Sequence, residues 1–373
     1  LLQFACMMTA TVALAVFSVR AAGGVEHIRA VVPAGRLEVL PPVDAPWMPV
    51  LALVVFLAVQ WWAAWYPGAE PGGGGYVAQR IFSARSERDG VLATLWFNVA
   101  HYCVRTWPWV MTALAAFVLY PELRTGGGDV EGAYVRVMID HLPRSLRGLM
   151  MAGFLGAYMS TVSTHLNWGA SYLVRDLYGR FVRPDATDAE LVRASRVATL
   201  VTMLVAGVTT LFLGSVEGAW KILLALGSGT GLVLILRWYW WRINAWSEVS
   251  AMLASLVFSV GLRVGLGLNP DRPHDFAVQM LGTLAGTTVV WVAVTLWTPP
   301  EPDDTLRAFY TRVRPVGPGW TRFARETGLA PLPPGLAVRA RDWALGVALI
   351  NLTLFGVGKV VLGEATLGAG LLL

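Results

Sequence analysis

Long runs of apolar residues, each close to the length of a membrane-spanning helix, recur along the whole chain. A helix that crosses the hydrocarbon core needs about 20 mainly apolar residues. The pattern predicts nine such segments, at residues 1–19, 47–66, 91–120, 147–174, 196–214, 218–240, 246–266, 276–297 and 342–373. Polar loops rich in Pro, Gly and Arg separate them. The chain is therefore predicted to be an all-α polytopic membrane protein.

The fourth segment differs from the others because polar residues recur on one of its faces. Spacings of three and four place a set of small and polar residues on one side of a helix: Ala157, Ser160, Thr161, Thr164, Asn167 and Ser171. The opposite side is predicted to carry Phe154, Leu155, Met159, Val162 and Leu166. Hydroxyls and amides inside a membrane need partners, so the polar face predicts contact with a neighbouring helix, a water-filled cavity or an ion.

Composition supports the membrane assignment. The chain is 55% hydrophobic and 14% charged, with a mean hydropathy of +0.56, whereas soluble domains carry about 25% charged residues. Cys6 and Cys103 lie in apolar runs, which indicates neither a disulfide framework nor a metal site. Both ends fall inside apolar segments, so we expect a fragment of a longer protein.

Arginines gather in alternate loops, which predicts the orientation of the chain. The basic loops are 79–90, 175–196, 237–242 and 298–341. Because cytoplasmic loops carry an excess of Lys and Arg, these loops are predicted to be cytoplasmic. The net charge of +5 therefore reflects membrane orientation and not a nucleic-acid surface. The N-terminal end is predicted to be cytoplasmic and the C-terminal end external.

Two further segments contain residues that could bind a substrate, and each also has a purely structural explanation. Residues 67–75, PGAEPGGGG, cannot continue a helix; they form either a substrate-binding break, with Glu70 as a site residue, or an ordinary loop. In the third segment, Asn98, His101 and Arg105 are about one turn apart. Arg105 either holds an anionic group or braces the helix bundle, and Pro108 is predicted to kink this helix.

The polar face of the fourth segment also fits a sodium site. Sodium prefers hard oxygen ligands. The Ala157 carbonyl and the Ser160 and Thr161 hydroxyls have the spacing to supply three of them. Close packing against another helix explains the same residues, and spacing alone favours that explanation.

Three stretches resemble the sodium:solute symporter family, which includes sodium–glucose, proline and sialic acid symporters. Residues 152–178, AGFLGAYMSTVSTHLNWGASYLVRDLY, resemble its signature helix: its small residue, hydroxyl pair, Leu-Asn and Asp fall on Ala157, Ser160, Thr161, Leu166, Asn167 and Asp176. Residues 77–86 and 227–248 are similar to two further family stretches. Residues 74–75 depart from the family pattern, so the substrate is not transferred.

The resemblance implies a leucine-transporter-like bundle of two inverted five-helix repeats, truncated at its N-terminus. Residues 1–19 resemble core helix five, residues 47–243 the second repeat with helices six to ten, and residues 244–373 peripheral helices. The family's sodium site implies Ala157, Ser160 and Thr161 as ligands, with the remaining ligands on helix one.

The expected function is sodium-coupled symport of a small solute across the bacterial inner membrane. The expected partners are sodium, the solute and the lipid bilayer, without nucleic acid and without a cofactor besides the coupling ion. Weaker substrate-side candidates are Trp65, Glu70, Asn98 and Arg105. Two alternatives remain: a membrane-embedded transferase with His101 as general base, and a sensor built on a symporter scaffold.

Overall fold

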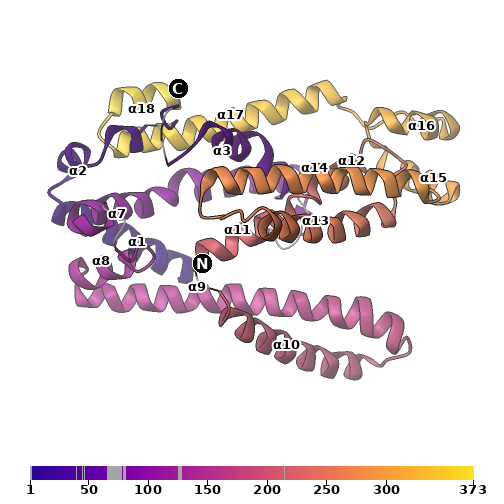
Figure 1. Ribbon diagram of the computed structural model, residues 1–373, viewed down its shortest axis with the longest axis horizontal. Helices are drawn as coiled ribbons and strands as arrows, with labels where there is room; N and C mark the ends of the chain where they lie inside the picture. The colour runs from indigo at the N-terminus through magenta and orange to yellow at the C-terminus, as the bar shows by residue number, and fades with distance from the viewer. Residues whose placement is uncertain are drawn as a thin grey trace. The chain divides into compact units, whose positions relative to one another are not determined.

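A computed structural model describes residues 2–38, 40–43, 45, 47–64, 78, 81–124, 128–213 and 215–373 (Figure 1). Helices joined by loops make up these residues, and no strand occurs among them. The prediction of an all-α chain is confirmed. The helices group into two compact units, one made of residues 1–37, 101–214 and 355–373 and the other of residues 38–100 and 215–354.

The first unit is built around a helix from the start of the chain. Its elements are α1 (Leu2–Ala21), α2 (Val25–Val31), α7 (Thr106–Leu119), α8 (Ala133–His141), α9 (Arg144–Ser171), a π-helix (Tyr172–Val182), α10 (Asp188–Thr210) and α18 (Ala365–Leu372). α1 packs against α7, α8 and α9, and α10 lies beside α9 (Figure 1). Leu14, Val137, Leu142 and Met150 are buried together where α1, α8 and α9 meet.

The second unit contains the remaining helices. They are α3 (Val50–Val54), α4 (Gln60–Ala63), α6 (Glu87–Asn98), α11 (Val216–Gly227), α12 (Gly231–Leu236), α13 (Ala245–Gly265), α14 (Pro273–Trp297), α15 (Asp303–Val313), α16 (Thr321–Thr327) and most of α17 (Leu336–Val361). α13 and α14 form its most extensive helix pair, and α11 packs against both (Figure 1). The start of α13 is capped by Asn244 and Ser247, each of which accepts from the other's backbone N–H.

The GSGTG sequence at 227–231 separates α11 from α12 and permits close helix contact. A side chain on Gly231 would collide with the backbone carbonyls of Trp62 and Ala63. A Cβ on Gly229 would lie 2.6 Å from Thr287 and 2.8 Å from Ser255. These two glycines therefore allow close approach of the backbones, because glycine has no side chain that would keep them apart.

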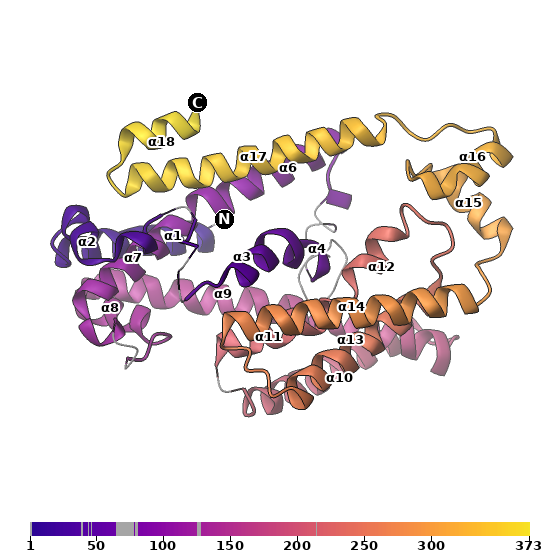
Figure 2. The ribbon, with the colours of Figure 1, turned by 45° about the horizontal axis from the view of Figure 1, so that its top comes forward.

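Several regions predicted as loops contain helices, among them the region that holds α2. Residues 175–195 are mostly helical: the π-helix extends to Val182, and α10 begins at Asp188 behind a capping box made by Thr187 and Glu190. Residues 298–341 contain α15 and α16, which pair as a short helical hairpin before α17 (Figure 2). Residues 121–146 contain α8. The prediction rested on low hydropathy, which identifies loops and short polar helices alike.

Six helical segments in the described residues are long and apolar enough to cross a membrane: Phe4–Ala21, Glu87–Leu119, Asp188–Thr210, Ala245–Gly265, Pro273–Trp297 and Leu336–Val361. Three other predicted spans differ. α9 is long enough but more polar, 47–66 contains the short apolar helix Val50–Ala63, and 218–240 is divided into α11 and α12. The last span also ends early, at Val361, where Gly363 adopts a positive φ of 86°. The count of nine spans stays a prediction.

Candidate functional site

α9 presents its polar face on the side that contacts α1. Met150 and Gly153 are buried, and a Cβ on Gly153 would lie 3.3 Å from the Met7 Cα. Successive residues of an α-helix are rotated by about 100°, so Ala157, Ser160 and Thr161 continue the face that carries Met150 and Gly153. The polar face is thus the continuation of a helix-packing surface.

The opposite side of α9 is apolar and exposed. Met151, Leu155, Tyr158 and Met159 are all exposed there, as suits contact with lipid. One residue predicted for this side is elsewhere. Phe154 packs against the buried cluster of the first unit and against the Tyr134 ring at 6.3 Å. Its assignment to the side opposite the polar face was wrong, because its position lies close to that of Met150 around the helix.

The polar face contains both bonded and unbonded hydroxyls. Thr164 Oγ1 donates to the Ser160 carbonyl at 2.7 Å, and Ser171 Oγ donates to the Trp168 carbonyl at 2.7 Å. These bonds within one helix are common for Ser and Thr in apolar surroundings. Ser160 and Thr161 are exposed and Ala157 is half-buried. Within the described chain, the hydroxyls of Ser160 and Thr161 donate no hydrogen bond, so their oxygens are available as ligands.

The chemistry of this face favours a hard monovalent cation over a transition metal. It offers neutral hydroxyl and carbonyl oxygens, which suit hard cations. Among the described residues, no group of three or more His, Cys, Asp or Glu side chains is placed to hold a metal ion. Three oxygens are fewer than a cation shell requires, so an ion bound at this face would also need ligands from a second element.

The helix that carries the other candidates is interrupted. A π-helix (Val99–Val104) follows α6, and Arg105 stands at a turn before α7. The predicted kink at Pro108 therefore lies upstream, at 99–105. Pro108 itself is the third residue of α7, where a missing N–H removes no bond within that helix. π-Helical turns of this kind are frequent at functional sites.

Arg105 interacts with an aromatic ring and not with a carboxylate. Its guanidinium lies 4.8 Å from the centre of the Trp109 ring, one turn further along. No acidic side chain of the described residues forms an ion pair with it. A cation over the face of Trp is stabilised by about 0.5–2 kcal/mol. This contact lies within a single helix and joins Arg105 to no other helix, so both roles of Arg105 stay predictions.

Asn98 lines a groove within the second unit. The groove has a volume of about 520 Å³ and lies between α6 and α17. Asn98 Nδ2 donates to the Thr94 carbonyl and Asn351 Nδ2 to the Val347 carbonyl, each at 2.8 Å. The groove is otherwise mainly apolar, so the two amides are its main polar groups. Trp65, Glu70 and the segment 67–75 lie outside the described residues.

A second set of polar residues was missed by the sequence interpretation. Buried polar side chains recur every four residues on facing sides of α13 and α14: Ser247, Ser255, Ser259, Gln279, Thr283, Thr287 and Thr295. Thr295 Oγ1 lies 2.7 Å from Ser247 Oγ, and Ser255 Oγ donates to the Leu226 carbonyl. We call these seven residues the polar seam. The spacing of four was visible in the sequence, but both segments had been assigned to the periphery.

The chain matches known proteins over most of its length. Residues 1–256 match the model of the sodium:solute symporter family. A sodium/glucose cotransporter of Vibrio parahaemolyticus is 24% identical over 249 residues, 61% of this chain and 44% of that protein. The high-affinity proline transporter PutP of Bacillus subtilis is 28% identical over 199 residues, 52% of this chain and 40% of that protein.

A third relative matches over a shorter stretch but at higher sequence identity. The osmoregulated proline transporter OpuE of Bacillus subtilis is 34% identical over 150 residues, 39% of this chain and 30% of that protein. The chain thus spans less than half the length of each of these relatives. Since the family model covers more than half of the chain, and apolar helices long enough to cross a membrane recur along it, the chain belongs to the sodium:solute symporter family and is a multi-pass protein of the cell membrane.

Proposed function

We propose that this chain contributes the coupling machinery of a symporter that uses a sodium gradient to move a small polar solute into a bacterial cell. The family match over residues 1–256 carries the proposal. Relatives are named for glucose, proline and myo-inositol. These solutes share small size, several hydrogen-bonding groups and no net charge, so we propose a substrate of that class.

Sodium binds, in this proposal, at Ala157, Ser160 and Thr161. The supporting observations are the absence of donated bonds from the two hydroxyls and their position on a helix-packing face. The Ala157 carbonyl and the two hydroxyls supply three oxygens, and an element packed on this face supplies the rest of the shell. Neutral ligands suit a coupling ion, because the ion must also leave readily.

The proposed organisation follows the family resemblance. Residues 1–19 act as core helix five, residues 47–243 as the second five-helix repeat, and residues 244–373 as peripheral helices. Substrate-side contacts are proposed for Trp65, Glu70, Asn98 and Arg105. The role of Asn98 is supported by its groove, which a second amide, that of Asn351, also lines. The role of Arg105 is supported by the helix interruption next to it.

Coupling follows from differential affinity between two conformations. A sodium ion that binds the outward-facing state more tightly shifts the population toward that state and raises solute affinity there. One charge crossing 100 mV releases about 2.3 kcal/mol. That energy corresponds to about a fiftyfold solute gradient, which is sufficient for concentrative uptake before any sodium concentration gradient is added.

Uptake by the full-length protein in proteoliposomes tests this function. Ser160→Ala and Thr161→Ala each remove one oxygen from the ion. We expect each to lower apparent sodium affinity at least about tenfold, because interactions with a charged partner contribute roughly 1.5–3 kcal/mol. Ser163→Ala is the matched control, since Ser163 is an exposed hydroxyl on another face of the same helix.

Three outcomes are distinguishable. Loss of sodium-dependent uptake in the two site variants, with normal uptake in the control, supports the site. Uptake with unchanged sodium dependence in both variants contradicts it. Solute binding without accumulation in any sodium gradient indicates the sensor function instead.

A further inference from the structure

A separate cavity lies in the second unit, at one end of α11, α13 and α14. Its volume is about 330 Å³. Lys221 of α11, Arg263 of α13 and Gln279 of α14 are the longer polar side chains that line it, and most other lining residues are aliphatic. The cavity therefore combines cations, an amide and an apolar wall, which is the composition of a site for an amphipathic ligand.

Gln279, one of the residues that line this cavity, carries an unused acceptor. Its side chain is 3% exposed, and its Nε2 donates to Ser259 O at 2.9 Å and to Ser259 Oγ at 3.3 Å. The Ser259 carbonyl only accepts, so it fixes the amide with Nε2 toward Ser259. Oε1 is buried and has no hydrogen-bond partner. A buried acceptor without a donor is destabilising, so a ligand that donates here gains a strong contact.

Of the two cationic side chains, Lys221 has carboxylate partners and Arg263 has none among the described residues. Lys221 Nζ lies 2.7 Å from Glu217 and 3.5 Å from Asp271, with its side chain 17% exposed. Arg263 is exposed, and no carboxylate among the described residues pairs with it. A guanidinium presents a planar fork that fits phosphate oxygens. Arg263 is thus the available partner for an anionic group at the mouth of the cavity.

The depth and the apolar wall indicate that the ligand is a lipid. Gln279 is six residues from Pro273, the first residue of α14, which places it about 9 Å from the helix end. On a membrane-spanning helix, a position this close to the helix end is expected near the boundary between head groups and acyl chains. Leu256, Val260 and Val264 of α13 line the cavity and are half or more exposed, so their outer surface is available to acyl chains.

We propose that this cavity binds a phospholipid whose head group carries an N–H or O–H donor. Arg263 binds the phosphate, with Lys221 beside it, and the ammonium of ethanolamine or a hydroxyl of glycerol donates to Gln279 Oε1. The acyl chains lie along α13. Phosphatidylcholine has the same phosphate but no donor in its head group, so the site discriminates against it.

Binding is measured on the full chain, purified and depleted of lipid, by native mass spectrometry and thermal shift. The probes are phosphatidylethanolamine, phosphatidylglycerol and phosphatidylcholine with identical acyl chains. We expect the first two to bind about tenfold more tightly than the third, since one hydrogen bond to a buried acceptor separates them. Gln279→Leu is expected to abolish that difference, and Arg263→Gln to weaken all three lipids.

Controls separate this site from general lipid binding. Arg272→Gln removes an exposed arginine from the adjacent loop that does not line the cavity, and it is expected to leave all three affinities unchanged. If Gln279→Leu does not fold, the affinities for phosphatidylethanolamine and phosphatidylcholine are compared in the parent chain and in Arg263→Gln. This comparison alone tests the proposal. Equal binding of the three lipids by the parent chain, or no effect of Arg263→Gln, overturns the proposal.

A soluble probe tests whether a lipid is required. Glycerophosphoethanolamine carries the same head group without acyl chains. We expect it to bind at least tenfold more weakly than phosphatidylethanolamine, because the aliphatic wall contributes through apolar burial. Equal affinity of the two would overturn the lipid assignment and indicate a soluble phosphoester.

Discussion

Individual hydroxyl groups in the polar seam are expected to contribute differently to the free energy of unfolding, because some form hydrogen bonds and some do not. Thr295 Oγ1 donates to the Trp291 carbonyl at 2.6 Å and lies 2.7 Å from Ser247 Oγ. Thr283 Oγ1 is equally buried but has no hydrogen-bond partner. Both residues lie on α14, three turns apart. They allow a comparison in which the chemical change is identical and only the bonding differs.

Thr295→Val is expected to lower the free energy of unfolding by about 1 kcal/mol, whereas Thr283→Val is expected to leave it unchanged or to raise it. Valine keeps the shape and removes the hydroxyl. At position 295 the change breaks a made bond, and at position 283 it removes an unsatisfied buried group. Thermal unfolding in detergent measures the difference. Equal destabilisation by both substitutions would contradict the assignment of their bonding.

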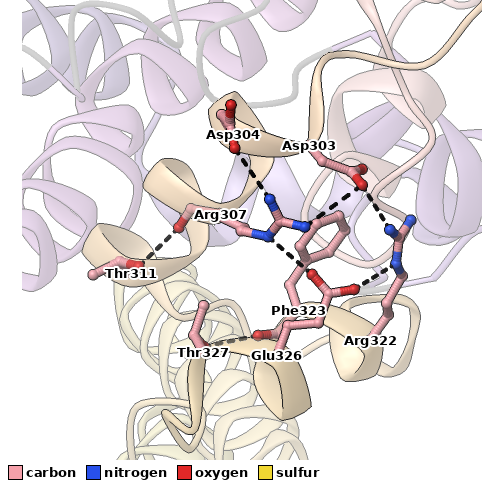
Figure 3. A network of polar contacts seen from close by, with 8 residues as sticks. All are labelled: Asp303, Asp304, Arg307, Thr311, Arg322, Phe323, Glu326 and Thr327. Carbon is pink, nitrogen blue, oxygen red and sulfur yellow. Dashed lines mark hydrogen bonds and ion pairs between the residues drawn. The ribbon is translucent and has the colours of Figure 1, made fainter.

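At the scale of elements, α15 and α16 are held together by a closed ring of charges. Asp303, Arg307, Glu326 and Arg322 alternate in sign around it (Figure 3). Arg307 Nε lies 3.0 Å from Glu326, and Arg322 lies 2.8 Å from Glu326 and 2.7 Å from Asp303. Beneath the ring, Leu306, Tyr310, Trp320 and Phe323 form a buried cluster. The hairpin thus has a small core of its own.

The ring makes the hairpin sensitive to acid. Hydrogen bonds from Arg322, and then from Arg307, lower the pKa of Glu326 below its ordinary 4.5. Its contribution is therefore present above pH 4.5 and is lost as pH falls through the lower pKa of the folded state. We expect Glu326→Gln to speed amide exchange in α16 at pH 7 and to have less effect below pH 4.5.

Hydrogen exchange followed by mass spectrometry measures this directly. High salt is expected to reduce the difference in α16 amide exchange between the parent chain and Glu326→Gln, because exposed charges are screened. Glu301→Gln is the control, since Glu301 forms no ion pair with the described residues. An effect of Glu326→Gln that is the same at both pH values would argue against the charge ring.

The type of most elements could be predicted from sequence, but their interruptions could not. Hydropathy located the six long apolar helices, but α10 begins eight residues before its predicted start and α17 ends twelve residues before its predicted end. It did not show the π-helix at 99–104 or the break of the last span at Gly363, because these depend on local backbone geometry. It also missed the helices at 303–313 and 321–327, whose polar outer faces lower the average over a window.

At the scale of the whole molecule, the charge pattern predicts which loops face the cytoplasm. The hairpin carries several arginines, whereas the turn between α13 and α14 is less basic. Asn269→Cys is expected to react with a membrane-impermeant maleimide from outside intact cells, and Asp304→Cys only after permeabilisation. Both positions are exposed, while native Cys103 is buried and Cys6 is partly buried. Labelling of Asp304→Cys in intact cells would contradict the orientation.

The candidate site could be predicted only in part, for a physical reason. A single helix shows which oxygens share a face, so Ala157, Ser160 and Thr161 were identified from spacing and resemblance. Spacing contains no information on the element that completes an ion shell. Arg105 illustrates the other limit, because the helix interruption beside it was not revealed by any periodicity.

The hairpin is also hydrogen-bonded to the turn that follows α12. Gly319 N donates to the Tyr239 carbonyl at 3.0 Å, and a side chain on Gly317 or Gly319 would collide with the backbone at 238–240. A movement of α12 that displaces residues 238–240 would then also displace the hairpin. A fluorescent probe attached to the hairpin would therefore report, from the aqueous side, a movement that begins among buried helices.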